Sequence, residues 1–163
     1  MGRAHVFGDD IDTDQIIPAQ HTTSSEPDHL ATHAMAGIDT SFSDRFEEGD
    51  IVVAGTNFGC GSSREHAAIA LQAVGAEAVV AESFARIFYR NAINIGLPVL
   101  HVPTVLDHVD ADDELSIDVE DGVVTNTSTD DILVAESLPP FVRHILDSGG
   151  LIEYGRSNGH RSQ

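Results

Sequence analysis

Short apolar runs and helical patterns alternate through the middle of the chain. Three runs rich in β-branched residues show no polar alternation, which is typical of strands buried on both faces of a sheet; they cover residues 51–54, 78–81 and 99–102. Between the first two runs, apolar residues recur at helical spacing over 64–74, and Gly75 ends this predicted helix. A second predicted helix ends at Gly96, and its apolar positions are Phe84, Ile87, Phe88 and Ile95. The order predicts an α/β fold with parallel strands at its centre.

The N-terminal part is less regular. A short strand ends at Val6–Phe7, and residues 8–27 are rich in Asp, Thr and Ser without lasting periodicity. Irregular segments of this length are uncommon in compact domains and are usually functional or mobile. A short helix is predicted over 28–35, before the first buried strand. We therefore expect the segment after the N-terminal strand to carry function.

The C-terminal part predicts a smaller antiparallel unit. Residues 115–119 alternate like a half-solvated strand, and Gly122 turns the chain back. A last helix is predicted over 138–148, and a polar tail begins near residue 155. The length of 163 residues predicts a single domain over 1–163, with a central parallel sheet and a smaller antiparallel part.

Acidic residues far outnumber basic ones. The chain carries 27 Asp and Glu against eight Arg and no Lys, and its formal net charge is −19. Such a surface repels phosphate backbones, so we expect no nucleic-acid partner. It also repels itself unless salt screens it, which favours a halophilic protein adapted to high intracellular salt over an acidic partner-binding surface.

Hydropathy and cysteine content indicate the cellular compartment of the protein. No apolar run approaches the roughly 18 residues of a membrane span, and the N-terminal residues lack a secretory pattern. The one cysteine, Cys60, excludes an internal disulfide, a structural zinc cluster and a three-cysteine iron–sulfur site within this chain. We expect a cytoplasmic protein with no membrane partner.

The most specific segment is the glycine-rich turn at 55–67, which leads from a strand into a helix. A Walker loop needs a lysine, a dinucleotide fingerprint needs glycine where Arg64 stands, and a nucleophile elbow needs glycine where Glu65 stands. A carboxylate or phosphate site remains, because two serines and an arginine stand at a helix N-terminus, where the dipole favours negative charge. The alternative is a capping box between Ser62 and Glu65, which leaves the glycines, Ser63 and Arg64 unexplained.

Metal-binding patterns are weak. A calcium loop that starts at Asp10 would need glycine where Gln15 stands and glutamate where His21 stands. The chain has nine histidines, but none pair as His-x-x-x-His with a glutamate on an evident helix. We therefore predict no metal site in this chain.

Three segments resemble the motifs of one known family. They are residues 9–19, residues 57–67, and residues 82–91 followed by Gly96-Leu97-Pro98. In order and spacing they resemble the small subunit of 3-isopropylmalate dehydratase (isopropylmalate isomerase), within the aconitase superfamily. The resemblance covers about residues 4–155, and residues 59–67 are its most specific part.

The resemblance implies the swivelling β/β/α domain of that superfamily. It also implies a hydro-lyase of leucine biosynthesis that isomerises 2- and 3-isopropylmalate by dehydration and rehydration, and that is active only as a heteromer with a large subunit. The [4Fe–4S] cluster belongs to that iron–sulfur large subunit and not to this chain. A base removes a proton α to a carboxylate, and the cluster iron acts as a Lewis acid on the leaving hydroxyl.

By position, the resemblance assigns roles to four residues. Ser62 matches the catalytic serine, whose alkoxide takes the proton. Ser63 and Arg64 match residues that bind substrate and stabilise charge, and Asp14 matches an aspartate that supports polar groups of the site. A serine base is physically reasonable here because the helix N-terminus and Arg64 both favour its negative form.

The loop after Pro18 does not identify the substrate. Relatives that accept isopropylmalate often carry a Tyr-Leu pair there, and relatives that accept a tricarboxylate carry an arginine. This chain has neither, and its predicted substrate-binding residues in the loop are Gln20, His21, Thr22 and Thr23. The alternatives to isopropylmalate are citramalate or citraconate, homoaconitate, or the small hydroxy-diacid of another aconitase-like hydratase. An alternative of another class is a non-enzymatic module that binds small anions.

Overall fold

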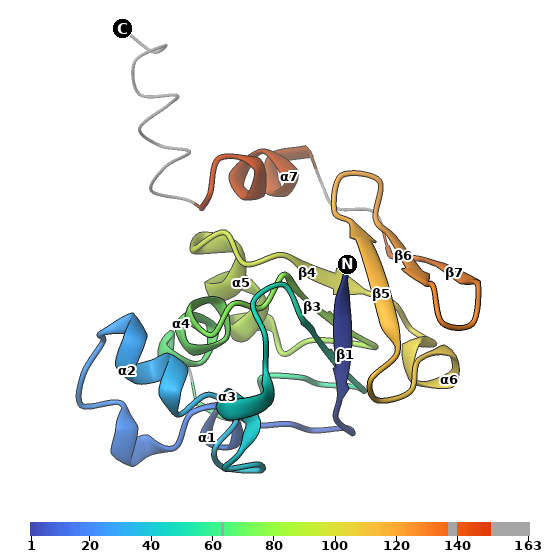
Figure 1. Cartoon of the computed structure of the whole chain (residues 1–163). Coiled ribbons are helices and arrows are strands. Elements are labelled where there is room, and N and C mark those ends of the chain that lie inside the picture. Colours follow the sequence, from blue (N-terminus) through green and yellow to red (C-terminus); the bar gives the residue numbers. More distant parts are fainter. Residues whose placement is uncertain (63, 137–139, 151–163) are drawn as a thin grey trace, which may run out of the picture.

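A mixed sheet forms the centre of the computed structural model, which describes residues 1–62, 64–136 and 140–150 (Figure 1). Its seven strands within these ranges lie in the order β4-β3-β2-β1-β5-β6-β7. They are β1 (Gly2–Val6), β2 (Ile51–Ala54), β3 (Ala78–Ala81), β4 (Val99–His101), β5 (Glu114–Asp118), β6 (Val123–Asn126) and β7 (Asp131–Val134). The predicted α/β class, with parallel strands and a smaller antiparallel part, is confirmed.

Two helices connect the parallel strands β2, β3 and β4. They are α4 (His66–Ala73), between β2 and β3, and α5 (Arg86–Asn94), between β3 and β4. The other helical segments in the described ranges are α1 (Thr13–Ile16), η1 (Ala19–His21), α2 (Pro27–Thr32), α3 (Phe42–Arg45), α6 (Val105–His108) and α7 (Pro140–Asp147). None of the helices in the described ranges combines the length and apolar character needed to cross a lipid bilayer.

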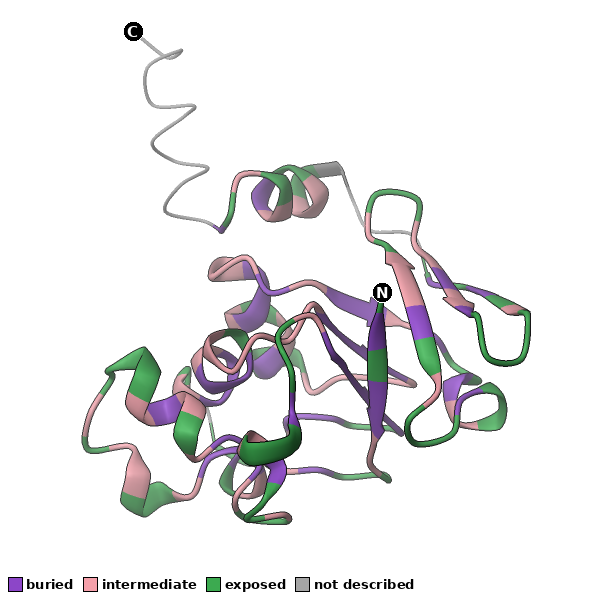
Figure 2. Ribbon diagram, in the orientation of Figure 1, coloured by how far each residue is buried: buried purple, intermediate pink, exposed green. Residues whose placement is uncertain are grey.

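The parallel half of the sheet is buried on both faces, as the unbroken apolar runs predicted. In β2, Val52 and Ala54 belong to the larger core under the helices, whereas Ile51 and Val53 belong to a second core. Figure 2 shows these strands buried at the centre, with exposed residues on the outer sides of α2 and α3. Parallel pairing joins β1 to β2, β2 to β3 and β3 to β4, so the segments that follow β1, β2 and β3 leave the same edge of the sheet.

The antiparallel half is larger than the sequence predicted. The β5–β6 hairpin forms as expected and turns through Gly122, which has a φ of +68°. Strand β7 pairs with β6 and was not predicted. Burial alternates along this strand, because Ile132 and Val134 are 68% and 69% exposed while Leu133 is buried. All three residues are apolar, however, so the sequence shows no alternation of polar and apolar positions that would identify a half-buried strand.

Two details of the predicted helices are wrong. Glu65, not Ser62, is the N-cap of α4, and its side chain makes no capping hydrogen bond. The capping box of Ser62 with Glu65, which the sequence left as the alternative to an anion site, therefore does not form. In the second helix, Ile87 is 47% exposed and Phe84 precedes the first turn, whereas Phe88 is buried as expected.

Candidate active site

The three motif segments meet at the edge of the sheet where β1, β2 and β3 end. Asp12 forms an isolated parallel bridge with Cys60, and Phe58 forms one with Phe84. The backbone N–H of Gly59 donates to the carbonyl oxygen of Ile11 at 2.7 Å. In open parallel sheets this carboxyl edge is the usual place for a ligand. It lies near α1, at the bottom of Figure 1.

Glycine is required at position 59 for two reasons. Its φ of +85° is a left-handed conformation that other residues rarely adopt. A Cβ atom at this position would also lie 2.3 Å from the Cβ of Phe88 in α5. The turn is thus held against α5, and the phenyl ring of Phe58 contacts that of Phe88 edge-on at 5.1 Å. This packing fixes the chain directly before Ser62.

The hydroxyl of Ser62 is held by a buried residue of the first motif. Ser62 is exposed, and its Oγ lies 3.0 Å from Oγ1 of Thr13, which is only 3% exposed. The backbone N–H of Ser62 donates to the same Thr13 oxygen at 3.2 Å. Because Thr13 Oγ1 accepts from that N–H, its own hydroxyl proton is free to point at Ser62 Oγ. The arrangement suits a serine oxygen that gains negative charge.

Thr13 is itself fixed by the local structure of α1. Asp12 caps this helix by accepting from the N–H of Gln15 at 2.8 Å, and Gln15 Oε1 accepts from the N–H of Asp12 at 2.9 Å. The backbone N–H of Thr13 donates to the carbonyl oxygen of Cys60 at 2.8 Å. Sequence reasoning missed Thr13, although the spacing of Asp12 and Gln15 is a capping-box signal.

Arg64 supplies positive charge with unused hydrogen-bonding capacity. Its Nη1 lies 3.6 Å from Oδ1 of Asp14. Within the described residues, this nitrogen is buried and makes no hydrogen bond. Nδ1 of His66, at the first position of α4, is likewise buried without a partner there. Buried donors and acceptors are normally satisfied, so both atoms point to a missing partner at this site.

The acidic residues around the turn serve as hydrogen-bond acceptors. Oδ1 of Asp9 accepts from the N–H of Thr56 at 2.8 Å, and Oδ1 of Asp10 accepts from Nδ2 of Asn57 at 3.1 Å. These bonds join the first motif to the second. The pKa of the half-buried Cys60 thiol is raised, first by burial and then by the charges of Asp12 and Asp10. Cys60 is therefore a neutral thiol at neutral pH.

The predicted substrate-binding residues divide into three groups. The structure brings Ser62, Arg64 and Asp14 together through the contacts with Thr13 and α1. Ser63 lies outside the described residues. The loop residues are joined to the site through Asp14, whose Oδ1 accepts from the N–H of Ala19 at 3.0 Å. Within the loop, Gln20 contacts His21 and the Thr22 hydroxyl donates to the carbonyl oxygen of Ala19, whereas the ring of His21 stacks on that of His33 beside α2. Thr23 is the fourth predicted loop residue.

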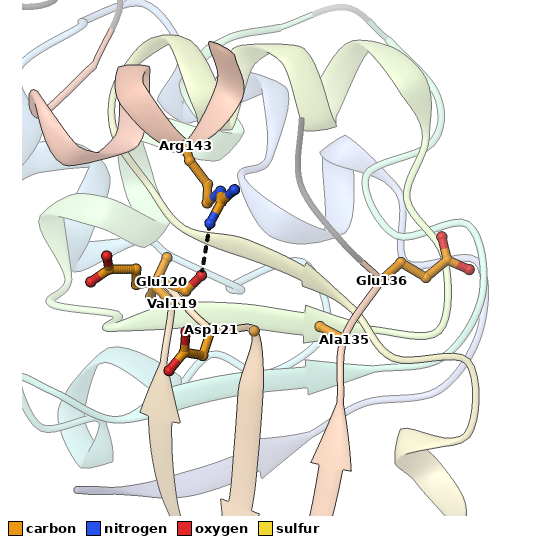
Figure 3. A pocket seen from close by; sticks show the side chains of 7 residues that line it. Val119, Glu120, Asp121, Ala135, Glu136 and Arg143 are labelled. Atoms are coloured by element: carbon orange, nitrogen blue, oxygen red, sulfur yellow. Dashed lines mark hydrogen bonds between the residues drawn. The ribbon is translucent and has the colours of Figure 1, made fainter. Parts of the chain in front are cut away.

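A separate pocket of about 170 Å³ lies between the β5–β6 hairpin, the end of β7 and α7 (Figure 3). Among the described residues that line it, Arg143 is the one cation, and its Nη1 donates to the backbone carbonyl oxygen of Glu120 at 3.5 Å. Three carboxylates also line it, from Glu120, Asp121 and Glu136. This negative lining opposes a dianionic substrate, so the edge near Ser62 is the better candidate site.

The chain resembles known proteins over nearly its whole length. The family model described as the aconitase C-terminal domain matches residues 8–104, a range that includes all three motif segments. The chain is 52% identical over 161 residues to the 3-isopropylmalate dehydratase small subunit 1 of Methanopyrus kandleri, covering 99% of this chain and 95% of that protein. It is 52% identical over 155 residues to the 3-isopropylmalate dehydratase small subunit of Methanosarcina mazei, covering 95% of each.

A solved structure extends the likeness to three dimensions. The crystal structure of 3-isopropylmalate dehydratase from Methanocaldococcus jannaschii matches with a TM-score of 0.94 and 46% sequence identity. The match covers 99% of this chain and 95% of that one. The two proteins therefore share one fold over nearly their whole length.

Proposed function

Because this chain belongs to the family of 3-isopropylmalate dehydratase small subunits, within the aconitase superfamily, we propose that Ser62 is the base that takes the α-proton of a hydroxy-diacid. The chain is the small subunit of a hydro-lyase of leucine biosynthesis that works with a large subunit. In the proposed step, the electron pair of the C–H bond forms a double bond as the hydroxyl leaves the neighbouring carbon. Rehydration at the other carbon completes an isomerisation.

The observation that carries this proposal is the pair of contacts between Ser62 and Thr13. A free serine hydroxyl is a very weak acid, so a serine base needs groups that favour its anionic form. The Thr13 hydroxyl is placed to donate to Ser62 Oγ, since Thr13 Oγ1 already accepts from the Ser62 N–H. The guanidinium of Arg64, two residues further along, adds positive charge to the same turn.

Arg64 and Ser63 are proposed to bind a carboxylate of the substrate. The Nη1 of Arg64 is buried without a hydrogen bond in the described part of the chain, and a carboxylate would satisfy it. Oδ1 of Asp14 lies 3.6 Å from the Arg64 guanidinium and also accepts from the N–H of Ala19. In this way Asp14 links the proton-transfer turn to the loop that starts at Ala19.

The iron–sulfur cluster is proposed to belong to the large subunit. This chain offers one thiol, and that thiol is half-buried with a raised pKa, whereas cluster ligands are thiolates. The residues present therefore do not fit a cluster site. The large subunit would supply the Lewis acid for the leaving hydroxyl.

We propose 3-isopropylmalate as the first substrate to test, with Gln20, His21, Thr22 and Thr23 as the residues that select it. Positions 20–23 hold polar side chains, so a smaller methyl-substituted diacid such as citramalate or citraconate is the second candidate. A tricarboxylate such as homocitrate ranks lower, because residues 4–44 contain no arginine for a third carboxylate.

A reconstituted complex tests this function directly. The chain is combined with its large subunit under anaerobic conditions and assayed for turnover of 3-isopropylmalate, citramalate and homocitrate. We expect turnover by the complex and none by the chain alone. Tight diacid binding by the lone chain, with no turnover of any diacid by the complex, would instead support a small-anion binding module.

A further inference from the structure

Three histidines, one of them in the proposed substrate loop, come together between η1 and α2. One ring nitrogen from each of His21, His29 and His33 lies within 4.8 Å of the corresponding nitrogens of the other two. We propose that these three residues form a binding site for a divalent transition-metal ion, with Zn²⁺ as the first candidate. The site goes beyond the proposed hydro-lyase function and does not depend on it.

Two of the ligands are brought together by helical spacing. His29 lies in α2, and His33, four residues later, is the C-cap of that helix. Residues four apart lie on one face of a helix, which is why two histidines at this spacing serve as a metal-binding pair. Their ring centroids are 4.9 Å apart. The pair lacks the glutamate that accompanies such histidines in metalloprotease motifs, since Leu30, Ala31 and Thr32 stand between them.

The third ligand comes from the loop. His21 ends η1, and its ring stacks on that of His33 with a centroid distance of 3.6 Å and an interplanar angle of 5°. The centroid of the His21 ring also lies 5.9 Å from that of His29. The fold of residues 19–33 brings His21 next to the other two histidines. The spacing of histidines in the sequence therefore does not identify it as a metal ligand.

The geometry is close to that of a metal site but needs side-chain adjustment. A tetrahedral zinc ion with Zn–N bonds of about 2.0–2.1 Å holds its ligand nitrogens roughly 3.3 Å apart. To bind zinc, the three nitrogens must therefore move closer together than their present separations of up to 4.8 Å. The parallel rings of His21 and His33 must also rotate so that their lone pairs point at one metal ion. Histidine side chains have several staggered conformations through which such a change can occur, and a water can fill the fourth position.

The chemistry of the three side chains suits a transition-metal ion. Neutral imidazole is the form that binds a metal. Glu26 and Asp28, at the start of the same helix, add negative charge nearby. Three imidazoles suit Zn²⁺, Ni²⁺ or Cu²⁺, and do not suit Ca²⁺ or Mg²⁺, which prefer oxygen ligands.

A bound ion would join the loop to α2. Through His21 it would fix η1, which also carries Gln20 of the predicted substrate loop. The site would therefore set the position of that loop, in addition to any direct contact of His21 with substrate.

The test is metal titration of the full, untagged, metal-free chain with Zn²⁺ and with Co²⁺, in dilute buffer and in molar KCl. Salt weakens binding of metal ions to exposed carboxylates but leaves imidazole–metal bonds largely intact. We expect one ion per chain in both buffers, and a visible Co²⁺ absorption typical of four-coordinate geometry. His29→Gln and His33→Gln should each weaken binding by about tenfold or more, whereas His144→Gln, at an exposed position in α7, should leave it unchanged.

Three outcomes would overturn the proposal. The first is that the chain binds no Zn²⁺ or Co²⁺ at micromolar metal concentrations. The second is that metal binding disappears in molar KCl, and the third is that it persists unchanged in both His29→Gln and His33→Gln. Circular dichroism of each variant checks that the fold is intact. Because the lone chain is used, failure here leaves the proposed function of Ser62 untouched, and failure of that function leaves this site untouched.

Discussion

The hydroxyl oxygens of Thr13 and Ser62 lie 3.0 Å apart, although 49 positions separate the two residues in the sequence. Thr13 is buried in the first turn of α1, and Ser62 is exposed at the end of the glycine-rich turn. The contact joins the first motif to the second. It makes Thr13 a positioning residue for the proposed base.

Thr13→Val tests this role, because valine keeps the shape of the side chain and removes the hydroxyl. Loss of one donor to a developing anion should lower kcat of the complex by about 10²-fold, with little change in KM. Thr13→Ser should restore most of the rate. Thr127→Val is the matched control, since the Thr127 hydroxyl bonds a backbone carbonyl in the antiparallel half. Equal kcat values for Thr13→Val and wild type would remove the positioning role.

Arg64→Lys should weaken substrate binding. Arginine can hold a carboxylate with two parallel hydrogen bonds, and lysine cannot. We expect KM to rise by about 10- to 100-fold, which corresponds to the loss of one charged hydrogen bond. Arg143→Lys, at the pocket in Figure 3, is the control and should behave as wild type. An unchanged KM in steady-state assays of Arg64→Lys would argue against carboxylate binding by this residue.

Because of Asp50, the free energy of unfolding should fall as the solution becomes acidic. Its side chain is 5% exposed and accepts from Nε2 of His5 at 2.9 Å and from the N–H of Arg3 at 3.0 Å. Burial alone would raise the pKa of Asp50, but these hydrogen bonds and that from the N–H of Glu47 outweigh it and lower the pKa. The stabilisation is therefore present above the ordinary pKa of 3.8 and is lost as pH falls through the lower, folded-state value.

The corresponding measurement is the free energy of unfolding of Asp50→Asn. Removing one partner of a buried pair should cost about 3 kcal/mol or more at neutral pH, and the loss should shrink as the pH falls below 4. Asp112→Asn is the control, because Asp112 is 76% exposed and its ion pair with Arg3 is long at 3.9 Å. That change should cost at most about 1 kcal/mol. A similar, small cost for both variants would contradict the account of Asp50.

Salt should stabilise the fold strongly. With a net charge of −19 and no lysine, repulsion between surface carboxylates opposes the compact state in dilute buffer. Molar KCl shortens the screening distance to about 3 Å and removes most of this repulsion. The Tm measured by calorimetry should therefore rise steeply from dilute to molar KCl. A Tm that does not change with KCl would contradict adaptation to high salt.

The sequence predicts the parallel centre of this fold well, because its signals are local. The runs of β2 and β3 are apolar throughout, since each strand is buried on both faces. The short helices α1 and α3 have four residues each, too few for a helical period to appear. Helices of this length are stable only through tertiary contacts and caps, which the sequence does not display as a pattern.

The candidate site was predicted in part, through resemblance to a family. That resemblance located Ser62, Arg64 and Asp14, and the structure brings these residues together. The interpretation of Ser62 as a helix cap was wrong because the Ser62 N–H and hydroxyl both engage Thr13, while α4 starts four residues later at His66. The contacts of Thr13 and of His21 cross between segments, so only the folded chain reveals them.

The most direct test of the proposed function is single-turnover and steady-state kinetics of the reconstituted complex carrying Ser62→Ala. Ser62 is exposed and is not the cap of α4, so the variant should fold and bind substrate nearly as wild type does. If Ser62 is the base, kcat should fall by about 10³-fold or more while the Kd of the substrate changes little. A Ser62→Ala complex that turns over substrate at the wild-type rate would contradict the assignment of Ser62 as the base.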